Sequence, residues 1–118
     1  MALDIDEVRE LKSFYPDVEG TEEAGVTFIR IPVLTLPAGC SPQKSEALLC
    51  PVPRDNYPSR LFLAQRVSHS GPGNNWNADG VLLAGKKWWA VSWHTHQTGQ
   101  RLLGMITAHL LAFTCKRT

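Results

Sequence analysis

The chain has 118 residues, of which 43% are hydrophobic and 19% charged, and 12 Lys and Arg against 11 Asp and Glu give a net charge of +1. This size predicts one domain, residues 1–118, able to bury about two-thirds of its unfolded surface. The scattered cations lack the basic patch typical of nucleic-acid binding. No apolar run approaches the ~20 residues of a membrane helix, and the first residues lack a signal-peptide pattern. We therefore expect a cytoplasmic protein.

A short amphipathic helix is predicted at the N-terminus. Asp4 and Glu7 have the spacing of a capping box, with Asp in the position usually taken by Ser or Thr. Pro16 disfavours helical geometry in the residue before it, so the helix must end near Tyr15.

Three strands are predicted next, over Val26–Leu36, about Ala47–Val52 and Leu61–Val67, where β-branched and apolar residues dominate. Pro32 cannot donate a ladder hydrogen bond, so it indicates either an edge strand or a bulge. Two prolines around Asp-Asn in Pro53–Ser59 predict a turn.

The last part of the chain predicts an irregular loop over Ser68–Gly80, with Trp76 seated against the body of the domain. Lys86-Lys87 is interpreted as a solvated turn. Apolar residues at helical spacing then predict a C-terminal helix from about Gly99 to Cys115, with His109 at its core face. Helix, antiparallel strand meander, long loop and C-terminal helix make an α+β domain.

The three cysteines are an odd number without CxxC spacing, which fits a reducing compartment. Cys50 and Cys115 are expected to be buried and inert. Cys40 follows the turn residues Pro37–Gly39 and is expected to be the most exposed of the three.

Several short motifs occur in a recognisable order: Pro53, Tyr57-Pro58, Trp88-Trp89 and Ser92-Trp93-His94. Together they resemble the ubiquitin-conjugating enzymes, and in particular the divergent bacterial family E. The resemblance covers roughly Asp4 to Phe113. It implies the ubiquitin-conjugating fold, no cofactor, and two partners: a ubiquitin-like protein, possibly multi-domain, and an activating-enzyme-like protein.

The resemblance also places the catalytic cysteine of the family at the end of Gly80-Val81-Leu82-Leu83, where this chain has leucine. Thioester chemistry needs a thiolate, and Leu83 has no lone pair. His69 falls near the histidine of the family's His-Pro-Asn motif, but Ser70-Gly71 follow it. The asparagines Asn74, Asn75 and Asn77 lie nearby, as they would in any turn-rich loop.

The histidines and tryptophans leave alternatives open. His94 and His96 would share one face of a strand and could hold zinc with His69 or Cys115, but acidic partners and metalloenzyme spacing are lacking, so a metal is not expected. His94 could instead carry a proton. Indoles are enriched at interfaces, and the residues assigned to partner binding are Tyr57, Pro58, Trp88, Trp89 and Trp93.

The leading hypothesis is therefore a ubiquitin-conjugating-like protein of a bacterial ubiquitin-like modification system that binds its partners without catalysis. The enzyme alternative uses a relocated thiol, with Cys40 first and Cys115 second, and its other catalytic candidates are His69 and His94. The third alternative is a small α+β interaction module unrelated to ubiquitin.

Overall fold

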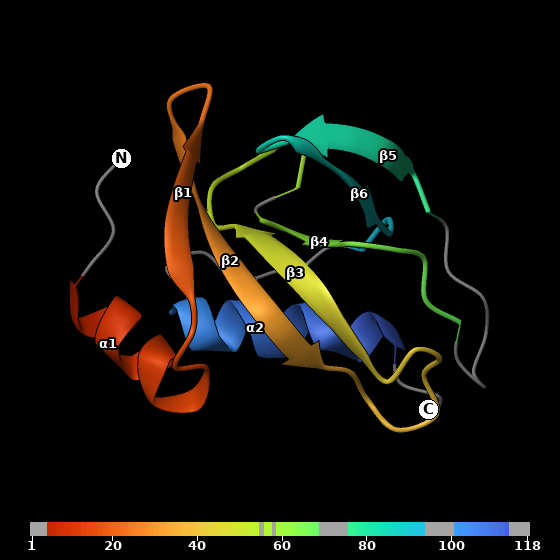
Figure 1. Ribbon diagram of the computed structural model, residues 1–118, viewed down its shortest axis with the longest axis horizontal. Coiled ribbons are helices and arrows are strands. Elements are labelled where there is room, and N and C mark those ends of the chain that lie inside the picture. The colour runs from red at the N-terminus through yellow and green to blue at the C-terminus, as the bar shows by residue number, and fades with distance from the viewer. Residues whose placement is uncertain (1–4, 55, 58, 69–75, 94–100, 114–118) are drawn as a thin grey trace.

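The computed structural model describes residues 5–54, 56–57, 59–68, 76–93 and 101–113 (Figure 1). In chain order the elements are α1 (Ile5–Phe14), β1 (Glu19–Glu23), β2 (Val26–Thr35), β3 (Lys44–Cys50), β4 (Arg60–Leu63), β5 (Ala78–Leu83), β6 (Lys86–Ala90), α2 (Leu102–Leu110) and the 3-10 turn η1 (Leu111–Phe113). Neither helix in this described part of the chain is long and apolar enough to cross a membrane.

The described strands form one antiparallel sheet in the order β1-β2-β3-β4-β6-β5. The first four strands follow one another as a meander, and the β5–β6 hairpin then adds to β4 through a single register pair, Leu63 with Trp89. At this junction the sheet curls, and in Figure 1 the hairpin arches away from the line of β3. The predicted α+β class is confirmed, with a helix at each end of a curled antiparallel sheet.

The β1–β2 and β5–β6 hairpins use the same tight turn. Ala24-Gly25 joins β1 to β2 with φ of 52° and 81°, and Ala84-Gly85 joins β5 to β6 with φ of 50° and 79°. Two successive left-handed residues make the turn whose twist matches that of paired strands. The Ala84 N–H donates to the Glu23 carboxylate at 3.3 Å, so the tips of the two hairpins meet.

Pro32 lies at a register shift between β2 and β3, where the pairing is interrupted from Ile31 to Leu34. The described pairs of β1 reach only as far as Arg30 along β2. The missing N–H of the proline therefore costs no ladder bond, and of the two alternatives, an edge strand or a bulge, the register shift favours the second.

Apolar side chains are buried on both faces of the sheet. On β3, Ala47 and Leu49 face the helices, whereas Leu48 and Cys50 face the other way, as the alternation of a strand requires. The core under the helices includes Leu11, Ile29, Ile31, Ala47, Leu49, Leu61, Leu63, Leu102, Ile106 and Phe113. The second core consists of Phe28, Leu48, Cys50, Phe62, Ala78, Leu83, Trp88 and Ala90.

Glu46 makes two charged contacts, one with β2 and one with β6. Glu46 on β3 pairs with Arg30 on β2 at 2.6 Å and with Lys86 at the start of β6. Partial burial alone would raise the pKa of Glu46, but the hydrogen bonds from Lys86 and Arg30 outweigh it and lower that pKa. The contact with Lys86 joins the β5–β6 hairpin to β3 on the side of the second core.

The N-terminus of α2 is capped by the other helix. Its N-cap residue, Arg101, makes no side-chain capping bond, and the N–H of Leu102 donates instead to the Glu7 carboxylate of α1 at 3.0 Å. Arg101 in turn pairs with Glu10 at 2.9 Å. A carboxylate at a helix N-terminus satisfies an orphan N–H and complements the helix dipole. Glu7 thus caps α2, and Asp4 of the expected capping box lies outside the described residues.

Some strands were not predicted, and two predictions about strands were wrong. The sequence did not predict β1, whose Glu-Gly-Thr-Glu-Glu composition disfavours strands, nor the pairing of β5 and β6. Lys86 and Lys87 begin β6 rather than forming a turn, because Ala84-Gly85 makes it. The strand expected over Leu61–Val67 ends at Leu63.

We predict that Trp88→Phe lowers the free energy of unfolding by about 1–3 kcal/mol, because a smaller ring leaves a cavity and removes the indole bond to the Leu83 carbonyl. Trp88 is 1% exposed and that bond is 2.9 Å long. Trp89→Phe on the half-exposed neighbour should cost less than about 1 kcal/mol. Urea unfolding of both variants measures the difference. A larger loss in Trp89→Phe would contradict the orientation of β6.

Candidate functional site

A closed turn presents Tyr57 next to β4. Arg54 and Tyr57 exchange two backbone hydrogen bonds, at 2.9 and 2.8 Å, and Asn56 between them has a φ of 71°. Asparagine tolerates this left-handed conformation better than most residues. The turn predicted over Pro53–Ser59 is therefore present, and it directs the Tyr57 ring inward, where the side chain is buried.

Tyr57 belongs to a connected set of polar side chains, here called the Tyr57 cluster: Tyr57, Arg60, Asn77 and Ser92. The Tyr57 hydroxyl accepts from the Asn77 amide at 2.9 Å and lies 2.7 Å from the Ser92 hydroxyl. The Arg60 guanidinium donates to the Asn77 side-chain oxygen and, at 3.1 Å, to the Val91 carbonyl.

Arg60 supplies the cation of this cluster. It is 3% exposed, and its guanidinium carbon lies 4.5 Å from the centre of the Tyr57 ring and 5.6 Å from that of Phe62. A guanidinium between ring faces gains cation–π energy as well as hydrogen bonds. Because Asn77 and Ser92 are exposed, the cluster reaches the surface through neutral polar groups and keeps its charge beneath them.

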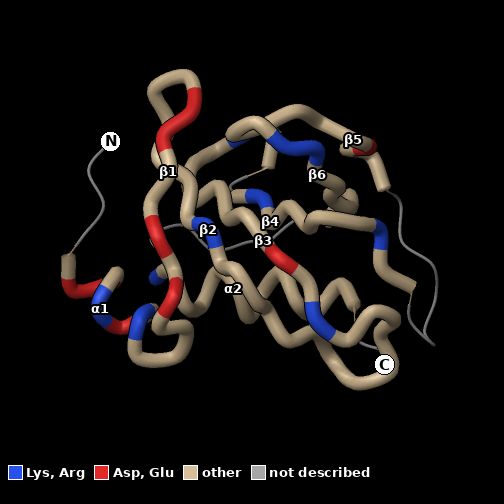
Figure 2. Tube along the Cα trace, in the orientation of Figure 1, with Lys and Arg blue, Asp and Glu red and all other residues tan. Residues whose placement is uncertain are grey.

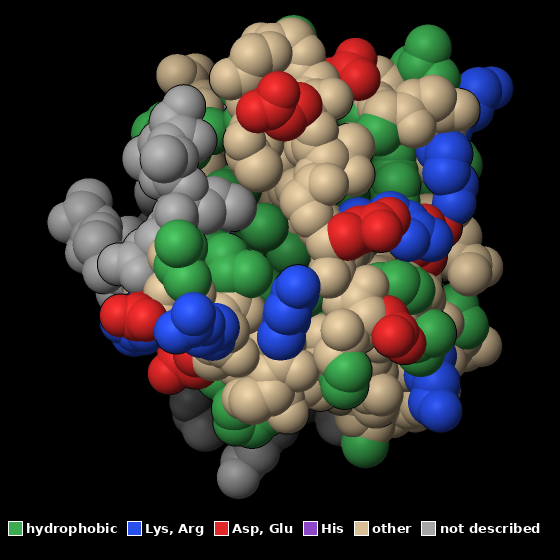
Figure 3. Space-filling model, turned by 60° about the vertical axis from the view of Figure 1, so that its left-hand side comes forward, with side chains coloured by type: hydrophobic (Ala, Val, Ile, Leu, Met, Phe, Trp, Pro, Cys, Tyr) green, Lys and Arg blue, Asp and Glu red, His purple; other side chains and the backbone are tan. Residues whose placement is uncertain are grey.

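The surface beside the cluster is formed by the open end of the β5–β6 hairpin. Register pairs join Ala78 to Ala90 and Asp79 to Trp89. The Trp89 indole donates to Asp79 at 2.6 Å, and Arg66 pairs with Asp79 at 3.0 Å. We call Trp89, Asp79, Asn77 and Ser92 the hairpin-end surface. On a different face, the α1 and β1 side that Figure 3 turns forward, acidic and basic side chains are intermixed rather than gathered into one patch.

A second polar pair lies on the helix side of β4. The Ser59 hydroxyl is 2.8 Å from His109 Nε2, and both residues are at most 5% exposed. Burial, followed by the nearby charge of Arg60, lowers the pKa of His109 from 6.5 to about 4. A serine and a neutral imidazole could in principle act as nucleophile and base. Their burial excludes a substrate, so the pair joins β4 to α2 instead.

The position that the resemblance assigns to the family's cysteine is part of an edge strand. Leu83 is 5% exposed and packs in the second core with Trp88, whereas the preceding Leu82 is 69% exposed. The Leu83 carbonyl accepts the Trp88 indole N–H. The side chain at this position therefore points into the protein.

Cys40 is more exposed than Cys50, as expected, but it is still buried, and the comparison with Cys115 lies outside the described residues. Cys40 is 7% exposed, belongs to the core under the helices, and its thiol donates to the Phe113 carbonyl at 3.4 Å. The cause is non-local, because the turn after β2 folds back beneath η1. Cys50 is buried as predicted, and Cys115 lies outside the described residues.

The three expected binding tryptophans have different environments. Trp88 is fully buried, so it supports the surface and does not form part of it. Trp93 is half-buried against the helix-side core and donates to the Ala108 carbonyl at 3.0 Å. Trp89 alone of these three belongs to the hairpin-end surface. Trp76 packs on Phe113 with ring centres 5.9 Å apart, as predicted.

Several candidates fall on residues whose placement is not described: Pro58, His69, Asn74, Asn75, His94 and His96. Within the described residues, no three His, Cys, Asp or Glu side chains are grouped so that they could hold a metal ion.

Sequence reasoning missed Arg60, and it considered Asn77 only as one of several loop asparagines. The signal for Arg60 was a charged residue at the start of an otherwise apolar strand, Arg-Leu-Phe-Leu, in which every residue is buried.

Comparison of the chain with protein-family models, with curated proteins and with solved structures found no match.

We predict that stability falls as the pH is lowered through the range between the two pKa values of His109. Unfolded His109 binds a proton near pH 6.5 and folded His109 only near pH 4, so acid favours the unfolded state in this window. Between about pH 7.5 and about pH 5 this residue should contribute a loss of about 2 kcal/mol.

His109→Gln is the matched control, because an amide keeps a partner for Ser59 and does not titrate. Urea unfolding of both proteins at the two pH values gives the difference, in which the carboxylates common to both cancel. Equal pH dependence of the two proteins would contradict a buried, neutral His109.

Proposed function

We propose that the chain is a ubiquitin-conjugating-like protein of a bacterial ubiquitin-like modification system, acting in the cytoplasm. In this proposal it binds a ubiquitin-like protein or an activating-enzyme-like partner and forms no thioester. The order of elements supports it: an N-terminal helix, the β1–β4 meander, and a C-terminal helix. Tyr57, the first residue of the Tyr-Pro motif, anchors the connection from β3 to β4.

The observation that carries the non-catalytic part is the side chain of Leu83. It is pure hydrocarbon and 5% exposed at the position where the resemblance expects a nucleophile. An acyl transfer needs a thiolate that reaches its substrate. Both described cysteines, Cys40 and Cys50, are buried as well.

Partner binding is assigned to the hairpin-end surface. Trp89 offers a half-exposed aromatic ring, and Asn77 and Ser92 offer polar groups that Tyr57 and Arg60 hold in place. Interfaces combine a rigid aromatic anchor with satisfied polar groups at its rim. The surface provides both, on a hairpin fixed by the burial of Trp88.

The enzyme alternative needs Cys40 to leave its contact with the Phe113 carbonyl. That step would uncover the core beneath η1, so the geometry favours the binding protein. The third alternative, an α+β module unrelated to ubiquitin, is less favoured because the described strands contain a four-strand meander, which the ubiquitin-conjugating fold requires.

We predict that incubation with ATP, an activating-enzyme-like protein and a ubiquitin-like protein gives no reductant-sensitive adduct. Non-reducing gels with and without dithiothreitol provide the measurement, and a conjugating enzyme with its own thiol is the positive control. An adduct that disappears in Cys40→Ser, Cys50→Ser or Cys115→Ser would overturn the non-catalytic proposal and identify the thiol.

We also predict that Trp89→Ala weakens binding of the same ubiquitin-like or activating-enzyme-like protein by about tenfold, because it removes the aromatic anchor. Val33→Ala is the control, since Val33 is 59% exposed on β2, remote from the hairpin end. Calorimetric titration measures both affinities. If the wild-type chain binds neither protein, the proposed function is wrong. An equal loss in both variants would exclude the hairpin-end surface as the contact.

A further inference from the structure

The turn half of the β5–β6 hairpin, residues 81–88, is joined to the sheet at one end only. Leu63 with Trp89 is the single register pair between β4 and β6. On the turn side of this pair, β6 is paired only with β5 in the part of the chain that the structure describes. We call residues 81–88 the hairpin arm.

The hairpin arm is a unit with its own hydrogen bonds. Register pairs join its two strands from Val81 with Trp88 to the turn, which Ala84-Gly85 closes. The Trp88 indole N–H donates to the Leu83 carbonyl at 2.9 Å, so the bond of this buried ring also lies within the arm. Movement of the arm as one piece therefore leaves these bonds intact.

A hinge lies at the base of the arm. The register of β5 shifts at a bulge around Gly80, which has a φ of 73°. A bulge interrupts the ladder, and glycine adopts either sign of φ without a steric penalty. Next to the bulge the hairpin is anchored, because the buried Arg60 guanidinium donates to the Asn77 side chain and to the Val91 carbonyl. Rotation can therefore occur at Gly80 while the open end stays in place.

Two carboxylates hold the turn end of the arm. Glu46 on β3 pairs with Lys86, and Glu23 on β1 accepts from the Ala84 N–H at 3.3 Å. Figure 2 shows acidic side chains along β1 and basic side chains at the start of β6. The Lys86 side chain is 51% exposed, and an ion pair with an exposed partner contributes little to stability. The turn end is therefore held less firmly than the base.

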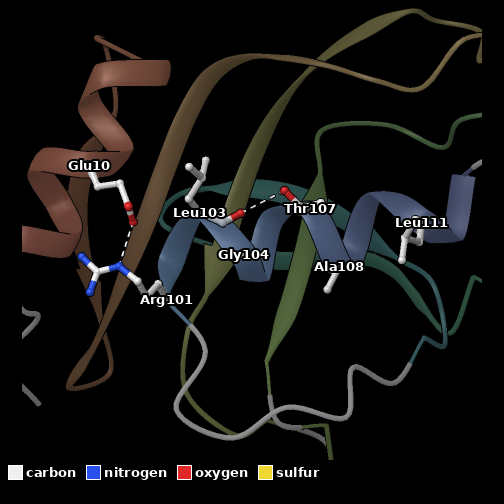
Figure 4. A pocket seen from close by; sticks show the side chains of 7 residues that line it. All are labelled: Glu10, Arg101, Leu103, Gly104, Thr107, Ala108 and Leu111. Carbon is white, nitrogen blue, oxygen red and sulfur yellow. Dashed lines mark hydrogen bonds and ion pairs between the residues drawn. The ribbon is translucent and has the colours of Figure 1, made fainter.

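The helices on the other face of the sheet are held more firmly than the arm. The Ser59 hydroxyl lies 2.8 Å from His109 Nε2 of α2, and both residues are buried. Figure 4 shows the ion pair of Arg101 with Glu10, which joins the start of α2 to α1. Breaking a buried hydrogen bond leaves polar groups without water and costs more than breaking an exposed ion pair. The arm should therefore open before the helices leave the sheet.

We propose that the hairpin arm is a hinged flap, which turns at Gly80 and opens while the rest of the sheet stays folded. Opening exchanges the two carboxylate contacts for contacts with water and lifts Leu83 and Trp88 out of the second core. Phe28 and Leu48, which belong to the same core, then become accessible. The burial of Trp88 keeps the closed state the major one. The hairpin-end surface lies at the base, so the flap is independent of the proposed function.

The first experiment is native-state hydrogen exchange of the wild type, followed by NMR at increasing urea concentrations below the unfolding transition. The arm amides and the Trp88 indole N–H should share one opening reaction. Its urea slope should be smaller than that of global unfolding, because only part of the buried surface is exposed. Protected amides of β3 and α2 should follow the global slope. A global slope for the arm, or exchange of the Trp88 indole without any urea dependence, would overturn the proposal.

The second experiment compares the same exchange in Lys86→Met and Lys87→Met. Lys86→Met removes the ion pair with Glu46, so the Trp88 indole should exchange about threefold faster, with the amides of α2 unchanged. Lys87 is exposed and, by strand alternation, projects to the opposite face, so Lys87→Met should leave both rates unchanged. An equal acceleration of the Trp88 indole and α2, or equal rates in the two variants, would contradict the flap. The first experiment needs no substitution and decides the question if Lys86→Met does not fold.

Discussion

The central constraint on this fold is that β3 and β4 are apolar on both faces. Leu49 and Leu61 face the helices, whereas Leu48 and Phe62 face the other way, and all four are buried. The two helices can cover only one side of the sheet, so the other side requires a second cover. The β5–β6 hairpin supplies it with Trp88, the largest side chain buried in the protein's described part. The curl of the sheet follows, because a flat sheet would leave Phe62 in water.

This covering hairpin also positions the hairpin-end surface. Because one face of the hairpin must be apolar, Leu83 points inward at a position where the resemblance expects a reactive group. Because the hairpin ends where the second core ends, its open end places Asn77 and Ser92 over Tyr57 and Arg60. A rigid polar surface with an aromatic ring beside it is suited to recognition. The same packing that forms this surface turns the Leu83 side chain into the second core.

The two covers of the sheet differ in what they present to the outside. The hairpin side ends in polar groups that are already hydrogen-bonded to one another, with Trp89 half-exposed beside them. The helix side ends in α2, which has no charge along its length. The two surfaces lie on opposite sides of the sheet.

Local physical rules in the sequence determined the end of α1 before Pro16, the α+β class, and the inward positions of Trp76 and His109. Each of these depends on one residue's backbone preference or on a short periodic pattern. For Pro32 the same rules allowed two outcomes, an edge strand or a bulge, and the register shift in the sheet decided between them. Only the tertiary structure decided the burial of Cys40, the contrast between Trp88 and Trp89, the capping of α2 by Glu7, and the partners of Arg60. Alternation along a strand separates its two faces but does not say what covers each face. Asn77 lies 17 residues from Arg60 in the chain, and the packing of the whole chain brings these two side chains together.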